Sequence, residues 1–154
     1  MARASSIRNL FMLTMVICIA PAIAQSSLDK DIIGKFEPQS RTSMAITGPI
    51  KITPKSITFN GKTVKTSLQG KYWRVWGEET QKRSANVYTL ERDPGTLLQG
   101  NTLCGANQAR YAVVWPSFDE TIGGSLQMAI YSSTESPQDS TSPGLCGTFS
   151  YVFE

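Results

Sequence analysis

The tripeptide Leu-Cys-Gly occurs twice in this chain, as Leu103-Cys104-Gly105 and as Leu145-Cys146-Gly147. Two cysteines in matching settings are expected to pair in an oxidising compartment. We therefore predict a Cys104–Cys146 disulfide that ties the middle of the chain to its last strand. The loop that it would close holds about 40 residues, for which the loop-entropy estimate is about 4 kcal/mol. Two buried free thiols are the alternative.

The first 24 residues have the three parts of a secretion signal. Two arginines supply a positive region, the run from Leu10 to Ala20 is almost wholly apolar, and Ala22-Ile23-Ala24 offers small residues to a signal peptidase. The apolar run is shorter than the ~20 residues that a membrane-spanning helix needs. We expect residues 1–24 to be removed together with Cys18, which leaves an exported protein, periplasmic or secreted, with no stable membrane anchor.

Charge and composition exclude several function classes. The chain has 15 basic and 12 acidic residues, and without the two arginines of the signal 13 basic residues remain. Such a balance gives no electrostatic reason to expect a nucleic-acid partner. The chain has no histidine and no Cys-x-x-Cys, so histidine-based nucleophile activation and the usual zinc sites are excluded. We expect no cofactor, no metal and no catalysis.

Short segments of alternating apolar and polar residues dominate the remainder, as is typical of strands. Asn60-Gly61 predicts a tight hairpin, and Gln69-Gly70-Lys71 a second turn. The nearly all-apolar run from Arg110 to Trp115 should be buried on both sides, or on one side with a loop over the other. Residues 132–144, rich in Ser, Thr and Pro, should form an exposed loop. The expected strands are 32–36, 44–52, 55–59, 62–68, 72–76, 86–91, 110–115, 126–131 and 147–153.

Sequential hairpins of this kind predict one all-β domain over residues 32–154, preceded by a flexible lead-in at residues 25–31. A single antiparallel meander of about eight strands is most economically a closed up-and-down barrel or a barrel-like sandwich, because closure removes exposed strand edges. The disulfide would join the last strand to the segment before the Arg110 strand.

Motifs along the chain resemble a group of small, mostly uncharacterised exported proteins of Gram-negative bacteria. The most specific are Asn101-Thr102-Leu103-Cys104-Gly105 and Leu145-Cys146-Gly147-Thr148-Phe149-Ser150-Tyr151, which fit patterns N-x-L-C-G and L-C-G-T-[FY]-x-Y. The resemblance implies a periplasmic, lipocalin-like or barrel-like domain, and it implies no established activity.

The start of the expected mature chain resembles a second family, the inhibitors of secreted metalloproteases of Gram-negative bacteria. Those inhibitors are small lipocalin-like barrels whose mature N-terminus begins with Ser-Ser-Leu or a similar sequence. Here Ser26-Ser27-Leu28 follows Gln25. This resemblance implies an alternative function, inhibition of a secreted metalloprotease through the N-terminal segment.

The strand expected at residues 72–76 carries the candidate ligand or partner surface. Alternation places Tyr72, Arg74 and Trp76 on one face and Trp73 and Val75 on the other. A charged Arg74 argues that its face is not dry core, so we expect this face at a solvent-reachable surface or barrel mouth and the other face buried. The alternative is that the aromatic residues only pack in the core and across strands.

Adjacent carboxylates offer a weaker candidate for chemistry. Glu78-Glu79 and Asp119-Glu120 lie in expected loops, and neighbours on a strand would point to opposite faces. We expect solvated loop charges at both places. Asp29 and Asp31 could hold a hard cation weakly, but they lack the spacing of a calcium loop.

These observations together favour an exported, non-catalytic binding or interaction module. Its partner would be a small ligand in the barrel or a periplasmic protein. A metalloprotease inhibitor and a structural protein of the cell envelope are the alternatives. A filled barrel interior would favour a partner at the surface, and a hollow of several hundred Å³ would favour a ligand.

Overall fold

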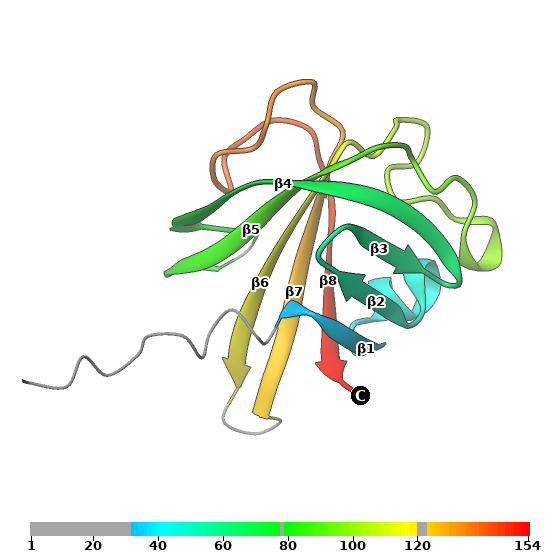
Figure 1. Cartoon of the computed structure of the whole chain (residues 1–154), viewed down its shortest axis with the longest axis horizontal. Helices are drawn as coiled ribbons and strands as arrows, with labels where there is room; N and C mark the ends of the chain where they lie inside the picture. Colours follow the sequence, from blue (N-terminus) through cyan, green and yellow to red (C-terminus); the bar gives the residue numbers. More distant parts are fainter. Residues whose placement is uncertain (1–31, 78, 120–122) are drawn as a thin grey trace, which may run out of the picture.

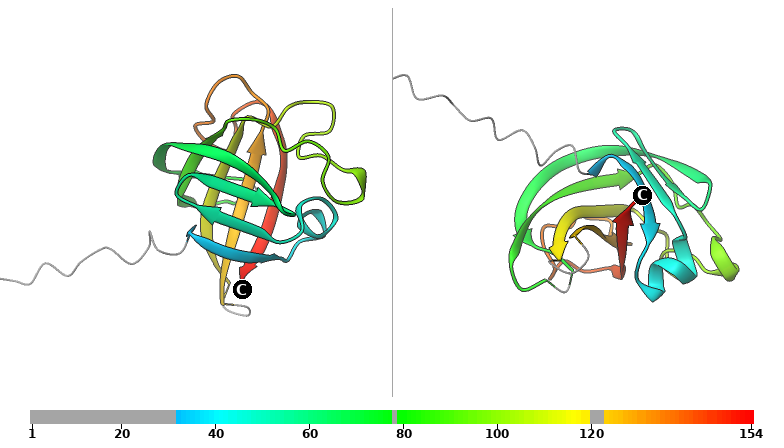
Figure 2. Two further views of the ribbon diagram at one scale, coloured as in Figure 1. Left: turned by 45° about the vertical axis from the view of Figure 1, so that its right-hand side comes forward. Right: turned by 90° about the horizontal axis from the view of Figure 1, so that it is seen from below.

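Eight antiparallel strands follow one another round a closed barrel in the order of the sequence. A computed structural model describes residues 32–77, 79–119 and 123–154. Strand β1 pairs with β8, with Phe36 opposite Phe153, and this pairing closes the ring (Figures 1 and 2). The predicted all-β antiparallel meander, closed into a barrel by pairing of its first and last strands, is thereby confirmed. The strands are β1 (Gly34–Pro38), β2 (Ile50–Thr53), β3 (Ser56–Phe59), β4 (Lys62–Val75), β5 (Lys82–Leu90), β6 (Tyr111–Asp119), β7 (Gly123–Tyr131) and β8 (Leu145–Phe153).

One of the two predicted turns is confirmed and the other is wrong. Asn60 and Gly61 join β3 to β4 with φ angles of 44° and 79°, a conformation that these two residue types tolerate. At Gly70 the chain does not turn, because β4 continues and only shifts its register with β5 between Leu68 and Gly70. The irregularity is a bulge, which bends a strand without ending its ladder.

The strand expected at 44–52 is also wrong in its first half. Residues Ser43–Thr47 form one π-helical turn, η2, and the strand begins only at Ile50. Ser43 Oγ donates to the carbonyl oxygen of Ser40 at 2.8 Å and lies 2.9 Å from that of Ser150. The bond to Ser40 is local and competes with strand pairing, whereas the contact with Ser150 fastens η2 to β8.

The barrel interior is filled by side chains from all eight strands. Thr47 Oγ1 lies 2.7 Å from the buried hydroxyl of Tyr151, so this hydroxyl has a polar partner inside the barrel. The described side chains thus form a packed core inside the barrel, as expected for a barrel of about eight strands. The interior cluster consists of Ile32, Phe36, Ile50, Ile52, Ile57, Phe59, Val64, Tyr88, Leu90, Leu97, Leu103, Cys104, Ala109, Ala112, Val114, Leu126, Met128, Ile130, Phe149 and Tyr151.

A second apolar cluster lies on the outer side of β5, β6 and β7. Its buried members are Trp76, Ala85, Val87, Val113, Trp115, Ala129 and Tyr131, with Tyr72 and Tyr111 packed against them. We call it the outer cluster. Strand β6 is therefore buried on both sides, as its apolar sequence predicted.

The segment expected as an exposed loop, residues 132–144, helps to cover the outer cluster. The backbone N–H of Ser140 donates to the carbonyl oxygen of Val75 at 2.8 Å, and Pro137 is buried. Tyr131 Oη lies 3.5 Å from the carbonyl oxygen of Asp139. The expectation of a merely exposed loop is corrected, because the outer cluster needs a cover that the strands alone do not supply.

The predicted disulfide is present. Cys104 and Cys146 are bonded, with Cα atoms 4.9 Å apart and a separation of 42 positions in the sequence. Cys104 lies in the connection between β5 and β6, is only 9% exposed and belongs to the interior cluster. In the same connection, the Asp93 carboxylate accepts hydrogen bonds from the backbone of Gly95 and Ala109, each at 2.6 Å. The bond thus joins a packed connection to the start of β8.

The outer cluster makes stability depend on pH in alkaline solution. Burial, with a smaller contribution from the charge of Asp139, raises the pKa of Tyr131 to about 12. Between pH 10 and 12 the unfolded phenol loses its proton while the folded one keeps it, so the free energy of unfolding should fall as pH rises. Denaturant melts at pH 9, 10 and 11 measure this slope. Tyr131→Phe should show a shallower slope, and an unchanged slope would contradict the assignment.

Candidate functional site

The β4–β5 and β6–β7 hairpins separate at one end of the barrel. Pairing of β5 with β6 ends at Asn86 opposite Val114, whereas β4–β5 pairing continues to Val75 opposite Lys82 and β6–β7 pairing to the end of β6. In Figure 1 the two hairpins leave the barrel in different directions. Pro116, which has no N–H for a ladder, lies just past the last pair. The barrel wall is therefore split here.

A hollow of about 360 Å³ lies in this split. We call it the mouth hollow. Its size is within the range of small-molecule sites. Its lining is mostly apolar at the barrel side, and its charged members, Lys71 and Arg83, are both cations. The lining residues are Ile32, Lys71, Trp73, Arg83, Ser84, Pro116, Ser117, Gly124, Ser125 and Phe153.

The predicted facing of the aromatic strand is wrong. Trp73 is 60% exposed and lines the mouth hollow, whereas Trp76 is fully buried in the outer cluster. Tyr72 also packs against that cluster, and Val75 is only half-buried. Arg74 is exposed as expected. Tyr72, Arg74 and Trp76 therefore do not form an open ligand surface.

The cause lies on the outer side of the barrel. Trp73 pairs with Ser84 and so shares the inward side of the sheet with Tyr88 and Leu90, but it does so beyond the filled part of the barrel. Tyr72 pairs with Ala85, which belongs to the outer cluster. The outward side of this hairpin is the covered one, and the inward side opens to solvent at the mouth.

A smaller hollow of about 260 Å³ adjoins the mouth hollow and shares Ile32 and Lys71 with it. Its other lining residues include the exposed Ile33 and Leu68. Six large apolar side chains are exposed in the described part of the chain, and four of them line the two hollows: Ile33, Leu68, Trp73 and Phe153. Exposed apolar surface gathered in one place marks a binding site more often than scattered residues do.

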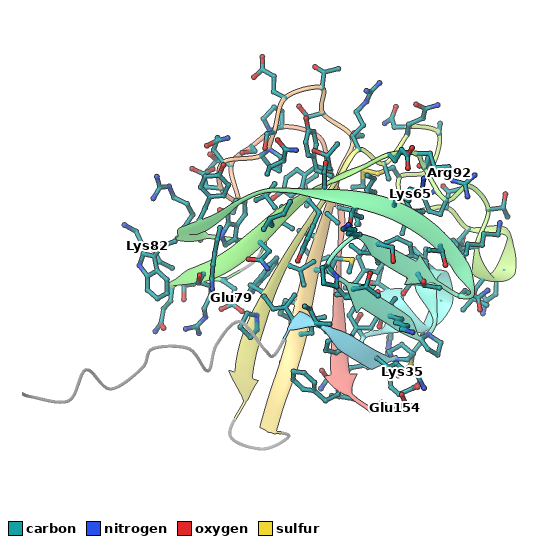
Figure 3. All side chains as sticks on the ribbon, in the orientation of Figure 1. Lys35, Lys65, Glu79, Lys82, Arg92 and Glu154 are labelled. Carbon is teal, nitrogen blue, oxygen red and sulfur yellow. A yellow bond between two sulfur atoms is a disulfide. The ribbon has the colours of Figure 1, made fainter. Side chains whose placement is uncertain are left out.

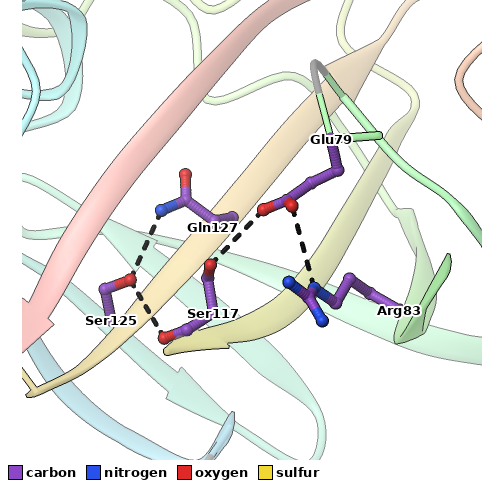
Figure 4. A network of polar contacts seen from close by, with 5 residues as sticks. All are labelled: Glu79, Arg83, Ser117, Ser125 and Gln127. Carbon is purple, nitrogen blue, oxygen red and sulfur yellow. Dashed lines mark hydrogen bonds and ion pairs between the residues drawn. The ribbon is translucent and has the colours of Figure 1, made fainter. Parts of the chain in front are cut away.

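A polar network forms the outer wall of the mouth hollow (Figure 4). Ser117 Oγ donates to Glu79 Oε1 at 3.3 Å, and Ser125 Oγ donates to the Ser117 carbonyl oxygen at 3.1 Å. Gln127 Nε2 lies 3.5 Å from Ser125 Oγ. Glu79 also faces Arg83, with Oε2 3.7 Å from Nε. The network connects the ends of three strands and holds Arg83 and both serines at the hollow.

Glu79 differs from the solvated loop charge that the sequence predicted, because its side chain is only 23% exposed and is hydrogen-bonded. Asp119 is the last residue of β6 rather than part of a loop. Glu78 and Glu120 lie outside the described residues, as do Ser26, Ser27, Leu28, Asp29 and Asp31. The acid pairs are therefore not brought together as a catalytic site by anything that the structure describes.

A third hollow, of about 330 Å³, lies beyond the network on the outer side of β6, β7 and β8. It is bounded by polar side chains and by Trp115, whose buried Nε1 has no hydrogen-bond acceptor among the described residues. Since polar groups make up most of its lining, this hollow offers a ligand less apolar surface than the mouth hollow does. Its lining residues are Glu79, Thr80, Trp115, Gln127, Thr148 and Ser150.

Surface ion pairs elsewhere are exposed and far apart in the chain. Lys35 Nζ lies 3.1 Å from Glu154 Oε2 (Figure 3), and Lys65 Nζ lies 4.0 Å from Glu91 Oε2. Exposed pairs of this kind contribute at most about 1 kcal/mol each.

No group of three or more potential metal ligands gathers within residues 32–77, 79–119 and 123–154. In the same ranges, no helix has the length and apolar character to cross a membrane.

Comparisons of this chain with family models, with curated proteins and with solved structures each returned no match. What stands is the architecture itself, an eight-stranded antiparallel barrel with one disulfide.

Proposed function

We propose that this chain is an exported, non-catalytic binding protein that holds a small apolar ligand in the mouth hollow. The observation that carries the proposal is Trp73, a large aromatic side chain left 60% exposed over a hollow of about 360 Å³. Burying that ring against a ligand would remove apolar surface from water, which is favourable at about 25 cal/mol per Å². Because the same ring contributes little to the packed core, its position is not explained by a contribution to the stability of the fold.

Export to the periplasm or beyond forms part of the proposal. The signal-like residues 1–24 and the A-x-A site support it, as does a disulfide that closes a long loop. The resemblance to small exported proteins of Gram-negative bacteria agrees with this placement. The lack of histidine in the chain supports a non-catalytic role.

A neutral fluorescent probe tests the proposal. N-phenyl-1-naphthylamine is apolar and uncharged, and we expect it to bind the purified protein with saturable enhancement of its fluorescence. Trp73→Ala should weaken that binding at least tenfold, because it removes the largest apolar surface of the mouth hollow.

Met44→Ala is the matched control, since Met44 is 53% exposed and does not line the hollow. It should leave the affinity for the probe unchanged. Saturable binding that Trp73→Ala does not weaken, or no binding at all, would refute the mouth hollow as the ligand site.

A further inference from the structure

The charged side chains at the mouth hollow narrow down its ligand. Arg83 is the cation at the polar end of the hollow, and the Glu79 carboxylate faces it from the network in the wall. Apolar side chains, Trp73, Pro116 and Phe153, form the rest of the barrel side. A site of this composition suits a molecule that is apolar at one end and anionic at the other.

The contacts of Arg83 show which part of its side chain a ligand can meet. Its Nε atom is buried and has no hydrogen-bond partner among the described residues. Glu79 Oε2 lies 3.7 Å from that nitrogen, which is an ion pair but is beyond hydrogen-bond distance. Because the buried Nε atom is out of a ligand's reach, contact with a ligand falls to the rest of the Arg83 side chain, which is 34% exposed and lines the hollow.

We propose that the mouth hollow binds a single-chain amphiphile with an anionic headgroup, such as a carboxylate, with the headgroup at Arg83 and the apolar part against Trp73. This inference rests on the proposed function and adds the chemical class of the ligand. The guanidinium group would meet a planar carboxylate through two parallel hydrogen bonds. Ser117 and Ser125, held by the polar network, flank the same end of the hollow.

The test is displacement of N-phenyl-1-naphthylamine by three ten-carbon compounds of different charge: decanoate, 1-decanol and decyltrimethylammonium. All are used as monomers at neutral pH and low salt. Decanoate should displace the probe at a concentration about tenfold lower than decanol, and the cationic compound should be the weakest. A failure of the probe itself to bind would refute the proposed function, whereas binding without preference for decanoate would refute only the ligand class.

Two substitutions locate the headgroup. Arg83→Gln should abolish the preference for decanoate over decanol while the neutral probe still binds. Glu79→Gln keeps Arg83 and removes its competing carboxylate, so affinity for decanoate should rise severalfold. If Arg83→Gln also weakens the neutral probe through a loss of folding, the Glu79→Gln variant alone decides, and an unchanged or lowered affinity for decanoate there contradicts the inference.

Arg74→Gln is the matched control. Arg74 pairs with Arg83 across β4 and β5, carries the same charge and does not line the hollow. Its substitution should change the affinity for decanoate less than twofold, because an exposed charge is screened by solvent.

A binding experiment with vesicles of anionic lipid completes the test. Tight binding to the vesicles together with no binding of monomeric decanoate would assign the cations to a membrane surface and overturn the proposal.

Discussion

Cys146→Ser is expected to lower the free energy of unfolding by about 2–5 kcal/mol, the usual cost of losing a native disulfide. The bond closes a loop whose ends are 42 positions apart in the sequence, and a cross-link over such a length strongly restricts the unfolded chain. The native state adds to the effect here. Cys104 belongs to the interior cluster beside Leu97, Leu103 and Ala109, all of which lie in the same connection between β5 and β6.

Guanidinium denaturation of the wild type and the variant, under oxidising conditions, measures this loss. The reduced wild-type protein should melt with the variant, and Cys104→Ser/Cys146→Ser should be no less stable than Cys146→Ser alone. A denaturation curve that Cys146→Ser leaves unchanged would show that the packed connection holds β8 in place without the covalent bond.

Local chemistry explains which parts of the fold the sequence predicted. Asn60-Gly61 forms its turn because both residues accept positive φ wherever they stand. Strand β6 is buried on both sides over residues 112–115, because all four side chains are apolar and belong in turn to the interior cluster and the outer cluster. The cysteines of the two Leu-Cys-Gly motifs are bonded to each other, as their matching settings predicted.

The errors arose where distant residues decide the local structure. Gln69-Gly70-Lys71 carries turn-forming residues, yet β5 supplies a ladder partner on both sides of Gly70 and the strand continues. Met44 and Ile46 alternate as in a strand, but η2 is held by a hydrogen bond from Ser43 to Ser150, over a hundred residues away. No pattern of neighbouring residues contains those partners.

The sequence predicted the strand that carries the candidate site but not which face of that strand is exposed. Alternation correctly separated Trp73 from Tyr72, but it cannot say which side of a strand is covered. That depends on the outer cluster, which is assembled from Trp76 and residues of β5, β6 and β7 and is covered in part by residues 132–144. Among the other residues that line the mouth hollow, Ile32, Pro116 and Phe153 come from three further segments. The one local signal was Pro116, which ends a wholly apolar run and so marks where β6 leaves its neighbour.

Trp73, in β4, and Trp76, just after its end, should differ strongly in how much their substitution lowers the free energy of unfolding. Trp76 is 0% exposed and packs with Trp115, Val113 and Tyr131 in the outer cluster. Its Nε1 donates to the Tyr72 carbonyl oxygen at 3.4 Å. The next residue, Gly77, has a φ of 55°, and a Cβ atom there would lie 3.0 Å from the Trp115 ring. The chain is thus fitted closely over β6 at this point.

Trp76→Ala should therefore lower the free energy of unfolding by about 3–5 kcal/mol, the range for loss of a large buried aromatic side chain. Trp73→Ala should lower it by less than about 1 kcal/mol, because a mostly exposed ring has little buried area to lose. Denaturant melts of the two variants, with Trp76→Phe as an intermediate that keeps most of the packed volume, measure the difference. Quenching of tryptophan fluorescence by acrylamide adds a second readout, since Trp73→Ala should remove the accessible fraction and leave the two buried rings. A larger loss of stability for Trp73→Ala than for Trp76→Ala would mean that β4 presents its other side, and the mouth hollow would then lose the residue on which its assignment depends.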